Sequence, residues 1–85
     1  MLKVDKVIVT VILNKNSAID MELPAFLPLS ELTGKILESL KILAPSEFEG
    51  TADIDLVHNG TVLDSRGTLA SIGIWDGSIL QISRR

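Results

Sequence analysis

The sequence predicts an α+β fold in which one helix covers one face of a mixed sheet, in the order β-β-α-β-β-β. Three observations predict it. A run of β-branched residues opens the chain, a segment of helical periodicity occupies its middle, and alternating segments around a hairpin signal fill its second half. With 85 residues, 46 % of them apolar, and no cysteine, the chain depends on a hydrophobic core. We expect residues 1–85 to form a single domain.

The first predicted strand, Val4 to Leu13, is rich in Val and Ile, which suit a pleated sheet better than a helix. Both of its faces are largely apolar, which is typical of a central strand. We expect it to lie parallel to the last strand. After the turn cluster at 14–17, apolar and polar residues alternate from Ala18 to Leu23, which indicates a second strand and a hairpin.

The predicted helix lies between two prolines. Ser30 is the predicted N-cap and Pro45 the predicted end. Gly34 is interpreted as a point of close packing on the sheet, and Phe26 as a cap on the core. The apolar stripe of this helix consists of Leu29, Leu32, Ile36, Leu40 and Leu43.

The second half of the chain is predicted to hold three strands. Asp53 to His58 alternates, Asn59-Gly60 is the strongest hairpin signal because both positions favour a positive φ, and a short strand returns from Thr61 to Leu63. Residues 46–51 and 64–73 are predicted to be loop or turn. The last strand runs from Ser78 to Ser83.

Charge and composition narrow the classes of function. The net charge of −3 argues against a nucleic-acid or anionic-membrane surface, since phosphate binding requires clustered Lys and Arg. No apolar run approaches the ~20 residues that span a bilayer. We therefore expect a cytoplasmic protein without direct membrane insertion.

The residues that could carry chemistry do not combine into a site. His58, the only histidine, precedes a hairpin turn and lacks a predicted nucleophile beside it. Asp53 and Asp55 share one strand face and could hold a hard cation, but Ca²⁺ takes ~6–8 oxygen ligands. The glycines are scattered at turns and form no phosphate-binding loop. The sequence thus predicts no catalytic residue, no metal and no cofactor.

Three segments carry a family resemblance: His58-Asn59-Gly60-Thr61-Val62-Leu63-Asp64, then residues 68–74 (TLASIGI), then residues 76–80 (DGSIL). They resemble ubiquitin-like domains, which implies the β-grasp fold over nearly the whole chain. Ubiquitin and the sulfur-carrier proteins end in a flexible Gly-Gly whose carboxylate is adenylated. This sequence has Arg84-Arg85 there, so we expect neither conjugation nor sulfur transfer.

A narrower resemblance lies in residues 20–29 (DMELPAFLPL) and the Leu-rich segment that follows. These residues resemble the YukD/EsaB family of ubiquitin-like proteins of bacterial type VII secretion systems. The resemblance implies a non-catalytic accessory or regulatory protein that binds a secretion-system component. Two alternatives remain open: the cytosolic N-terminal domain of an EccD-type membrane component, and the small β-grasp subunit of a multicomponent monooxygenase.

Strand parity indicates where a partner would bind. If Val7, Val9 and Val11 face the core, Ile8 and Ile12 face outward, and the same argument places Val57 and Ile79 on that outer face. Val57 lies where the recognition patch of ubiquitin has its isoleucine. Trp75 is either an exposed binding residue or packed across the loop before the last strand. We predict that Ile8, Ile12, Val57 and Ile79 bind a protein partner, with a homodimer as a possible use of this face and Trp75 as a further candidate.

Overall fold

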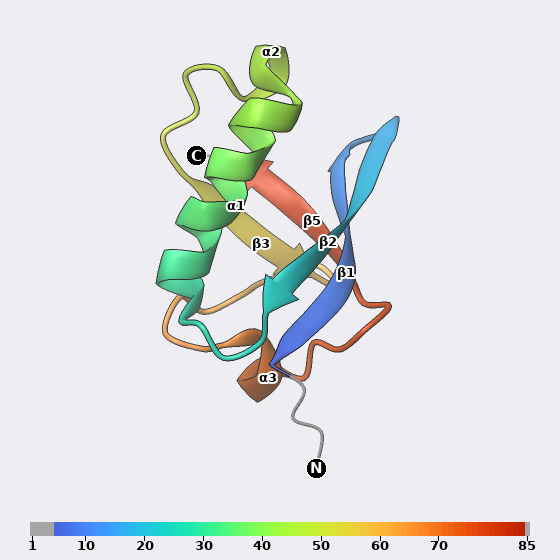
Figure 1. Cartoon of the computed structure of the whole chain (residues 1–85), viewed down its shortest axis with the longest axis vertical. Coiled ribbons are helices and arrows are strands. Elements are labelled where there is room, and N and C mark those ends of the chain that lie inside the picture. The colour runs from blue at the N-terminus through green and yellow to red at the C-terminus, as the bar shows by residue number, and fades with distance from the viewer. Residues whose placement is uncertain (1–4, 85) are drawn as a thin grey trace.

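The computed structural model describes residues 5–84, and they form one mixed five-stranded sheet with a helix across one face (Figure 1). The sheet order is β2-β1-β5-β3-β4. Its elements are β1 (Lys6–Asn14), β2 (Ser17–Pro24), α1 (Leu29–Leu43), α2 (Pro45–Phe48), β3 (Ile54–His58), β4 (Thr61–Val62), α3 (Leu69–Ile72) and β5 (Ile79–Arg84). The predicted α+β, ubiquitin-like β-grasp fold is confirmed.

The two ends of the chain meet at the centre of the sheet. β1 pairs with β5 in parallel, with Thr10 opposite Ile79 and Ile12 opposite Gln81, and every other pairing is antiparallel. β1 is covered by protein on one face only, so its helix-side residues are buried while the apolar residues on its other face stay partly or largely exposed. The predicted parallel pairing of the first and last strands is confirmed.

The hydrophobic core lies between the sheet and α1. Val7, Val9 and Val11 from β1 are at most 1 % exposed, and Leu80 from β5 is fully buried. The helix contributes Leu29, Leu32, Ile36, Leu37 and Leu40. The predicted inward faces of β1, β3 and β5 are therefore correct. The alternate residues of these strands face outward, as the predicted register requires.

The start of α1 differs from the prediction. Ser30 lies inside the helix, which begins at Leu29 and has no side-chain cap. The backbone N–H groups of Leu29 and Ser30 donate to the carbonyl oxygens of Gly67 and Ser65, at 2.9 and 3.0 Å. The carbonyl groups of the loop before α3 therefore take the place of a capping side chain as hydrogen-bond acceptors for the start of α1.

Three predicted packing roles are wrong. Gly34 is exposed, and a Cβ atom there would meet no atom within 4 Å, so it makes no close approach to the sheet. Leu43 is 64 % exposed because α1 runs on toward α2 beyond the strands, and the buried Phe48 of α2 closes this end of the core (Figure 1). Phe26 is 57 % exposed because its neighbour Ala25 takes the buried position.

Two segments predicted to be loops contain short helices. α2 begins at Pro45, which suits the first position of a helix because its missing N–H would have no intrahelical partner. α3 is held by a reciprocal capping box in which the Thr68 side chain accepts from the Ser71 N–H and the Ser71 side chain accepts from the Thr68 N–H.

Candidate functional site

The face of the sheet opposite α1, here called the outer face, carries the residues predicted to bind a partner. Ile8 and Ile79 are 51 % and 53 % exposed, and Ile12 and Val57 are half-buried. Parity assigns all four to this face, because their neighbours in β1, β3 and β5 are buried on the helix side. We call Ile8, Ile12, Val57 and Ile79 the outer-face cluster.

The strand register fixes how the cluster is arranged. Ile79 lies directly opposite Thr10, while Gln81 lies between Ile12 and Val57 in the next row. Ile12 and Val57 are therefore diagonal neighbours of Ile79, at about 7–8 Å, a distance that long side chains bridge. The cluster is thus centred on Ile79, and two polar side chains, Thr10 and Gln81, interrupt it.

The loop before β5 is fixed to β1 at Ile8. The Asp76 carboxylate accepts a hydrogen bond from the Ile8 N–H at 2.8 Å, and the Gly77 N–H donates to the Ile8 carbonyl at 2.9 Å. Gly77 has a φ of 88°, which a side chain would strain. This loop carries Trp75, which is 57 % exposed, so the side chain is not packed away across the loop.

A shallow hollow lies beside the cluster, lined by Val57, Ile79, Gln81 and the turn residues Asn59 and Gly60. Asn59 and Gly60 have φ values of 52° and 80°, as the hairpin signal predicted. The exposed Val62 of β4 lies directly opposite Val57 and continues the apolar surface toward the sheet edge. The sequence analysis did not include Val62, although its parity in the return strand could have indicated it.

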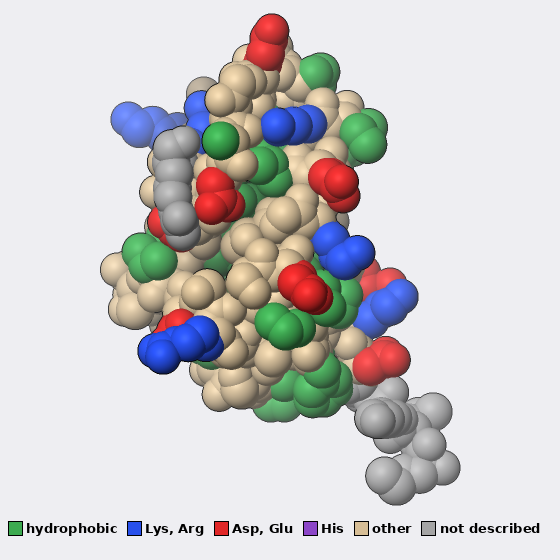
Figure 2. All heavy atoms as spheres, turned by 90° about the vertical axis from the view of Figure 1, so that its left-hand side faces the viewer, with side chains coloured by type: hydrophobic (Ala, Val, Ile, Leu, Met, Phe, Trp, Pro, Cys, Tyr) green, Lys and Arg blue, Asp and Glu red, His purple; other side chains and the backbone are tan. Residues whose placement is uncertain are grey.

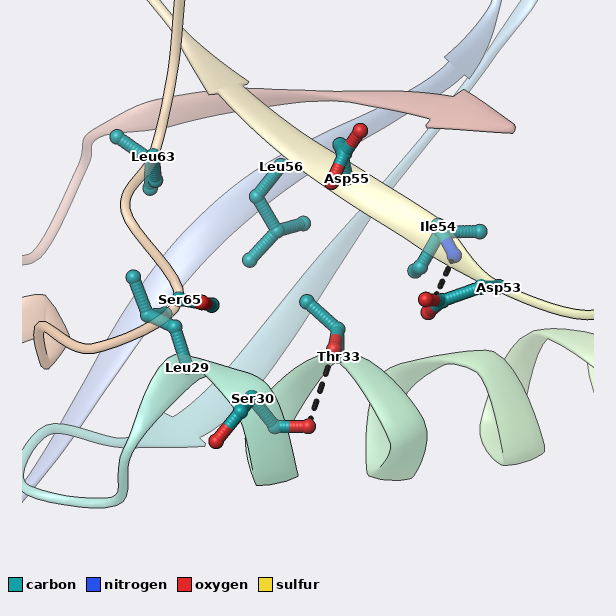
Figure 3. Close-up of a pocket in the computed structure, with 9 residues that line it drawn as sticks. All are labelled: Leu29, Ser30, Thr33, Asp53, Ile54, Asp55, Leu56, Leu63 and Ser65. Carbon is teal, nitrogen blue, oxygen red and sulfur yellow. Dashed lines mark hydrogen bonds between the residues drawn. The ribbon is translucent and has the colours of Figure 1, made fainter. Parts of the chain in front are cut away.

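A cavity of about 250 Å³ lies between the start of α1 and β3. Figure 3 shows the residues that line it, which include three hydroxyl side chains, two carboxylates and four aliphatic side chains. The Asp53 carboxylate accepts from the Ile54 N–H at 2.9 Å, and the Thr33 hydroxyl donates to the Ser30 carbonyl at 3.4 Å. Within residues 5–84, no three His, Cys, Asp or Glu side chains are grouped as a metal ion requires. His58 is half-buried beside the turn.

The far end of β5 is held by a contact that the sequence analysis missed. The Arg84 guanidinium lies 3.3 Å from the Glu47 carboxylate and 4.9 Å from the centre of the Phe48 ring. Asn14 donates a hydrogen bond to the same Glu47 carboxylate. Arg84, expected to be a tail residue, is therefore part of β5, while Arg85 lies outside the described residues.

One ion pair shifts the titration of its members. The Arg66 side chain donates to both carboxylate oxygens of Asp64, at 3.3 and 3.1 Å, and this hydrogen bonding lowers the pKa of Asp64 and raises the pKa of Arg66. Both groups are exposed, so the pair contributes little to stability.

The helix side of the molecule also exposes apolar residues, since Ile42 and Leu43 at the end of α1 are 79 % and 64 % exposed. Figure 2 shows the left-hand side of the molecule as drawn in Figure 1, with acidic and basic side chains intermixed and apolar side chains gathered mainly toward its lower end. In the part of the chain that the structure describes, no helix is long and apolar enough to cross a membrane.

The fold and the exposed sheet face define a ubiquitin-like domain. Residues 6–82 match the family model of YukD, a protein of the WXG100 protein secretion system (Wss). The chain therefore belongs to the YukD family, a ubiquitin-like family of type VII secretion systems. No curated protein matches it by sequence.

Several solved structures share the fold. A chain of the MycP5-free ESX-5 inner membrane complex is 23 % identical, with a TM-score of 0.79 over 95 % of this chain and 21 % of that one. The ubiquitin-like domain of the Mycobacterium tuberculosis type VII secretion protein EccD1 is 21 % identical, with a TM-score of 0.75 over 91 % and 96 %. The EccD5 ubiquitin-like domain from Mycobacterium xenopi is 18 % identical, with a TM-score of 0.78 over 94 % of each chain.

This chain thus spans about a fifth of the ESX-5 complex chain but nearly all of the two isolated EccD domains. Family membership supports the two secretion-system interpretations and leaves the monooxygenase-subunit interpretation without support.

Proposed function

We propose that this chain is a non-catalytic, cytoplasmic module of a type VII secretion system that binds another protein component of that system through the outer face of its sheet. Membership of the YukD family supports the system. The observation that carries the binding role is the exposure of Ile8, Ile79 and Trp75 on and beside one sheet face.

Burial of these side chains would stabilise a complex. Apolar surface removed from water contributes about 25 cal/mol per Å², and a tryptophan is among the residues that contribute most at interface centres. The acidic residues Asp20 and Glu22 of β2 stand on the same face, opposite Thr10 and Ile8. They would lie at the rim, where charge sets orientation more than affinity.

A second candidate is the cytosolic N-terminal domain of an EccD-type membrane component. The likeness to the EccD1 and EccD5 ubiquitin-like domains supports it. The coding sequence after Arg85 discriminates between the two: a long apolar continuation favours the EccD-type domain, and a stop codon favours the separate accessory protein. Both candidates use the outer face in the same way.

The proposal is tested by co-purification from the organism that encodes the chain, with its secretion-system components as the proteins measured. The test variant is Ile8→Asp with Ile79→Asp. Ile42→Asp is the matched control, because Ile42 is 79 % exposed on α1. A carboxylate buried without a partner costs an interface several kcal/mol. The double variant should lose the component while the control retains it, and equal recovery by all three proteins would refute the proposal.

A further inference from the structure

The two edge strands of the sheet, β2 and β4, differ in length. At one edge β4 has only two residues, while at the other β2 has eight and pairs only with β1. From Ala18 to Pro24 the pairing of β2 with β1 is regular, and its one irregularity lies at the turn between Ile12 and Asn14. Long regular edge strands present a row of backbone donors and acceptors to any further strand.

The hydrogen bonds identify which residues of β2 have backbone groups directed outward. The Thr10 N–H donates to the Ser78 carbonyl on the β5 side, so the odd-numbered residues of β1 bond to β2. The Ala25 N–H donating to the Asp5 carbonyl agrees with this alternation. The register then pairs odd with odd, and the backbone groups of Ala18, Asp20 and Glu22 point away from the sheet.

The side chains along this edge select the kind of strand that fits. Asp20 and Glu22 lie on the outer face and are exposed, while Ile19 and Met21 lie on the helix side and are partly buried against the core. The Thr10 hydroxyl donates to the Asp20 carboxylate at 2.8 Å, and Lys6 lies 3.8 Å from the Glu22 carboxylate. Both carboxylates therefore contact side chains of β1 on the outer face, and Lys6 offsets part of the charge of Glu22.

A second copy of this chain is a poor occupant. Antiparallel pairing of two β2 strands centred on Asp20 places one Asp20 opposite the other, and pairing centred on Met21 places Asp20 opposite Glu22. Like charges directly opposite destabilise a strand pair. In these two registers the acidic residues oppose self-association, and they favour a strand of opposite charge.

We propose that the outer edge of β2 is a second binding site, distinct from the outer-face cluster, that adds an antiparallel strand from a partner protein. The added strand carries Lys or Arg at alternate positions, opposite Asp20 and Glu22, and apolar residues between them that pack beside Ile19 and Met21. Main-chain hydrogen bonds to residues 18, 20 and 22 provide the affinity, and the charges provide the selectivity.

The probe is a synthetic hexapeptide of alternating lysine and valine, compared with one of alternating glutamate and valine, added to the isotopically labelled protein. Amide exchange should slow by at least about tenfold at residues 18, 20 and 22 with the lysine peptide only, and the effect should weaken as salt rises. Chemical-shift changes confined to Ile8 and Ile79, or no change at β2, would overturn the proposal.

Two variants complete the test. Asp20→Pro removes an N–H that points outward, a position where an edge strand accepts proline, so the fold should hold and peptide binding should fall at least about tenfold. Asp20→Lys with Glu22→Lys keeps the backbone and should transfer binding to the glutamate peptide. Binding that persists in the proline variant, or a dimer through β2, would contradict the proposal. Val57→Asp, which changes the outer-face cluster at a position away from β2, should leave this binding intact, which separates the edge from the proposed function.

Discussion

Asp76 fixes the backbone of Ile8: its carboxylate accepts the Ile8 N–H at 2.8 Å across 68 residues of sequence. The next residue, Gly77, donates to the Ile8 carbonyl. Both backbone groups of Ile8 are thus used by the loop that carries Trp75. This relationship holds two apolar binding candidates, Ile8 and Trp75, at the same end of β1.

Replacing Asp76 by alanine should loosen this loop. The Ile8 N–H loses its acceptor, and the free energy of unfolding should fall by about 0.5–1.5 kcal/mol, the range of a single exposed hydrogen bond. Denaturant titration followed by the fluorescence of Trp75, the only tryptophan, measures both the stability and the loop. Asp76→Asn keeps an acceptor and should lie closer to the wild type; an unchanged stability for Asp76→Ala would show that the bond contributes nothing.

Replacing Ile36 by alanine should be far more damaging. Ile36 is 1 % exposed between α1 and the sheet, and loss of its side chain leaves a cavity that costs about 2–5 kcal/mol. Ile42→Ala on the exposed side of the same helix should change stability by less than about 0.5 kcal/mol. Thermal unfolding of both variants tests the pair, and similar melting temperatures would contradict the assignment of the helix face.

Arg84→Ala should destabilise the end of β5. The variant removes the ring contact with Phe48 and the ion pair with Glu47, which together contribute about 0.5–1 kcal/mol at this exposure. Arg84→Lys keeps the charge but not the planar stacking group, so its stability should lie between that of the wild type and that of Arg84→Ala. Amide exchange at Asp55 and Ser83, which pair across β3 and β5 next to Arg84, reports the local effect. Exchange unaltered by Arg84→Ala would argue against the contact.

The Asp64–Arg66 pair should affect the stability of the fold only at acidic pH. The pKa of Asp64 lies below its ordinary value of 3.8 in the folded protein because Arg66 stabilises the carboxylate. The stabilisation is therefore present above 3.8 and is lost as pH falls through the lowered pKa. In Arg66→Gln, the carboxyl resonance of Asp64 should titrate closer to 3.8, and the same titration curve in both proteins would contradict the pair.

Much of the fold could be predicted because its signals are local. The valines of β1, the spacing of Leu29, Leu32 and Ile36, and the Asn59-Gly60 turn each determine structure within a few residues. Parity then placed the buried and exposed residues of β1 and β5 correctly.

The errors involve contacts between distant segments. Phe48 follows Pro45 closely and precedes Gly50, which favoured a loop, and only the tertiary structure shows that it fills the end of the core in place of Leu43. Ser30 looked like a cap because the sequence does not show that the loop at 65–67 supplies backbone acceptors to α1. The Asp76 contact with Ile8 lacks a local signal for the same reason.

The central claim, that the outer face of the sheet binds a secretion-system protein, is tested most directly by methyl NMR on protein labelled at isoleucine. The spectra are compared before and after addition of the co-purifying component. The methyl signals of Ile8, Ile12 and Ile79 should shift or broaden when one equivalent of the partner is added, while those of Ile42 on α1 should not. Shifts confined to Ile42, with the outer-face signals unaffected in a complex that has formed, would contradict the claim.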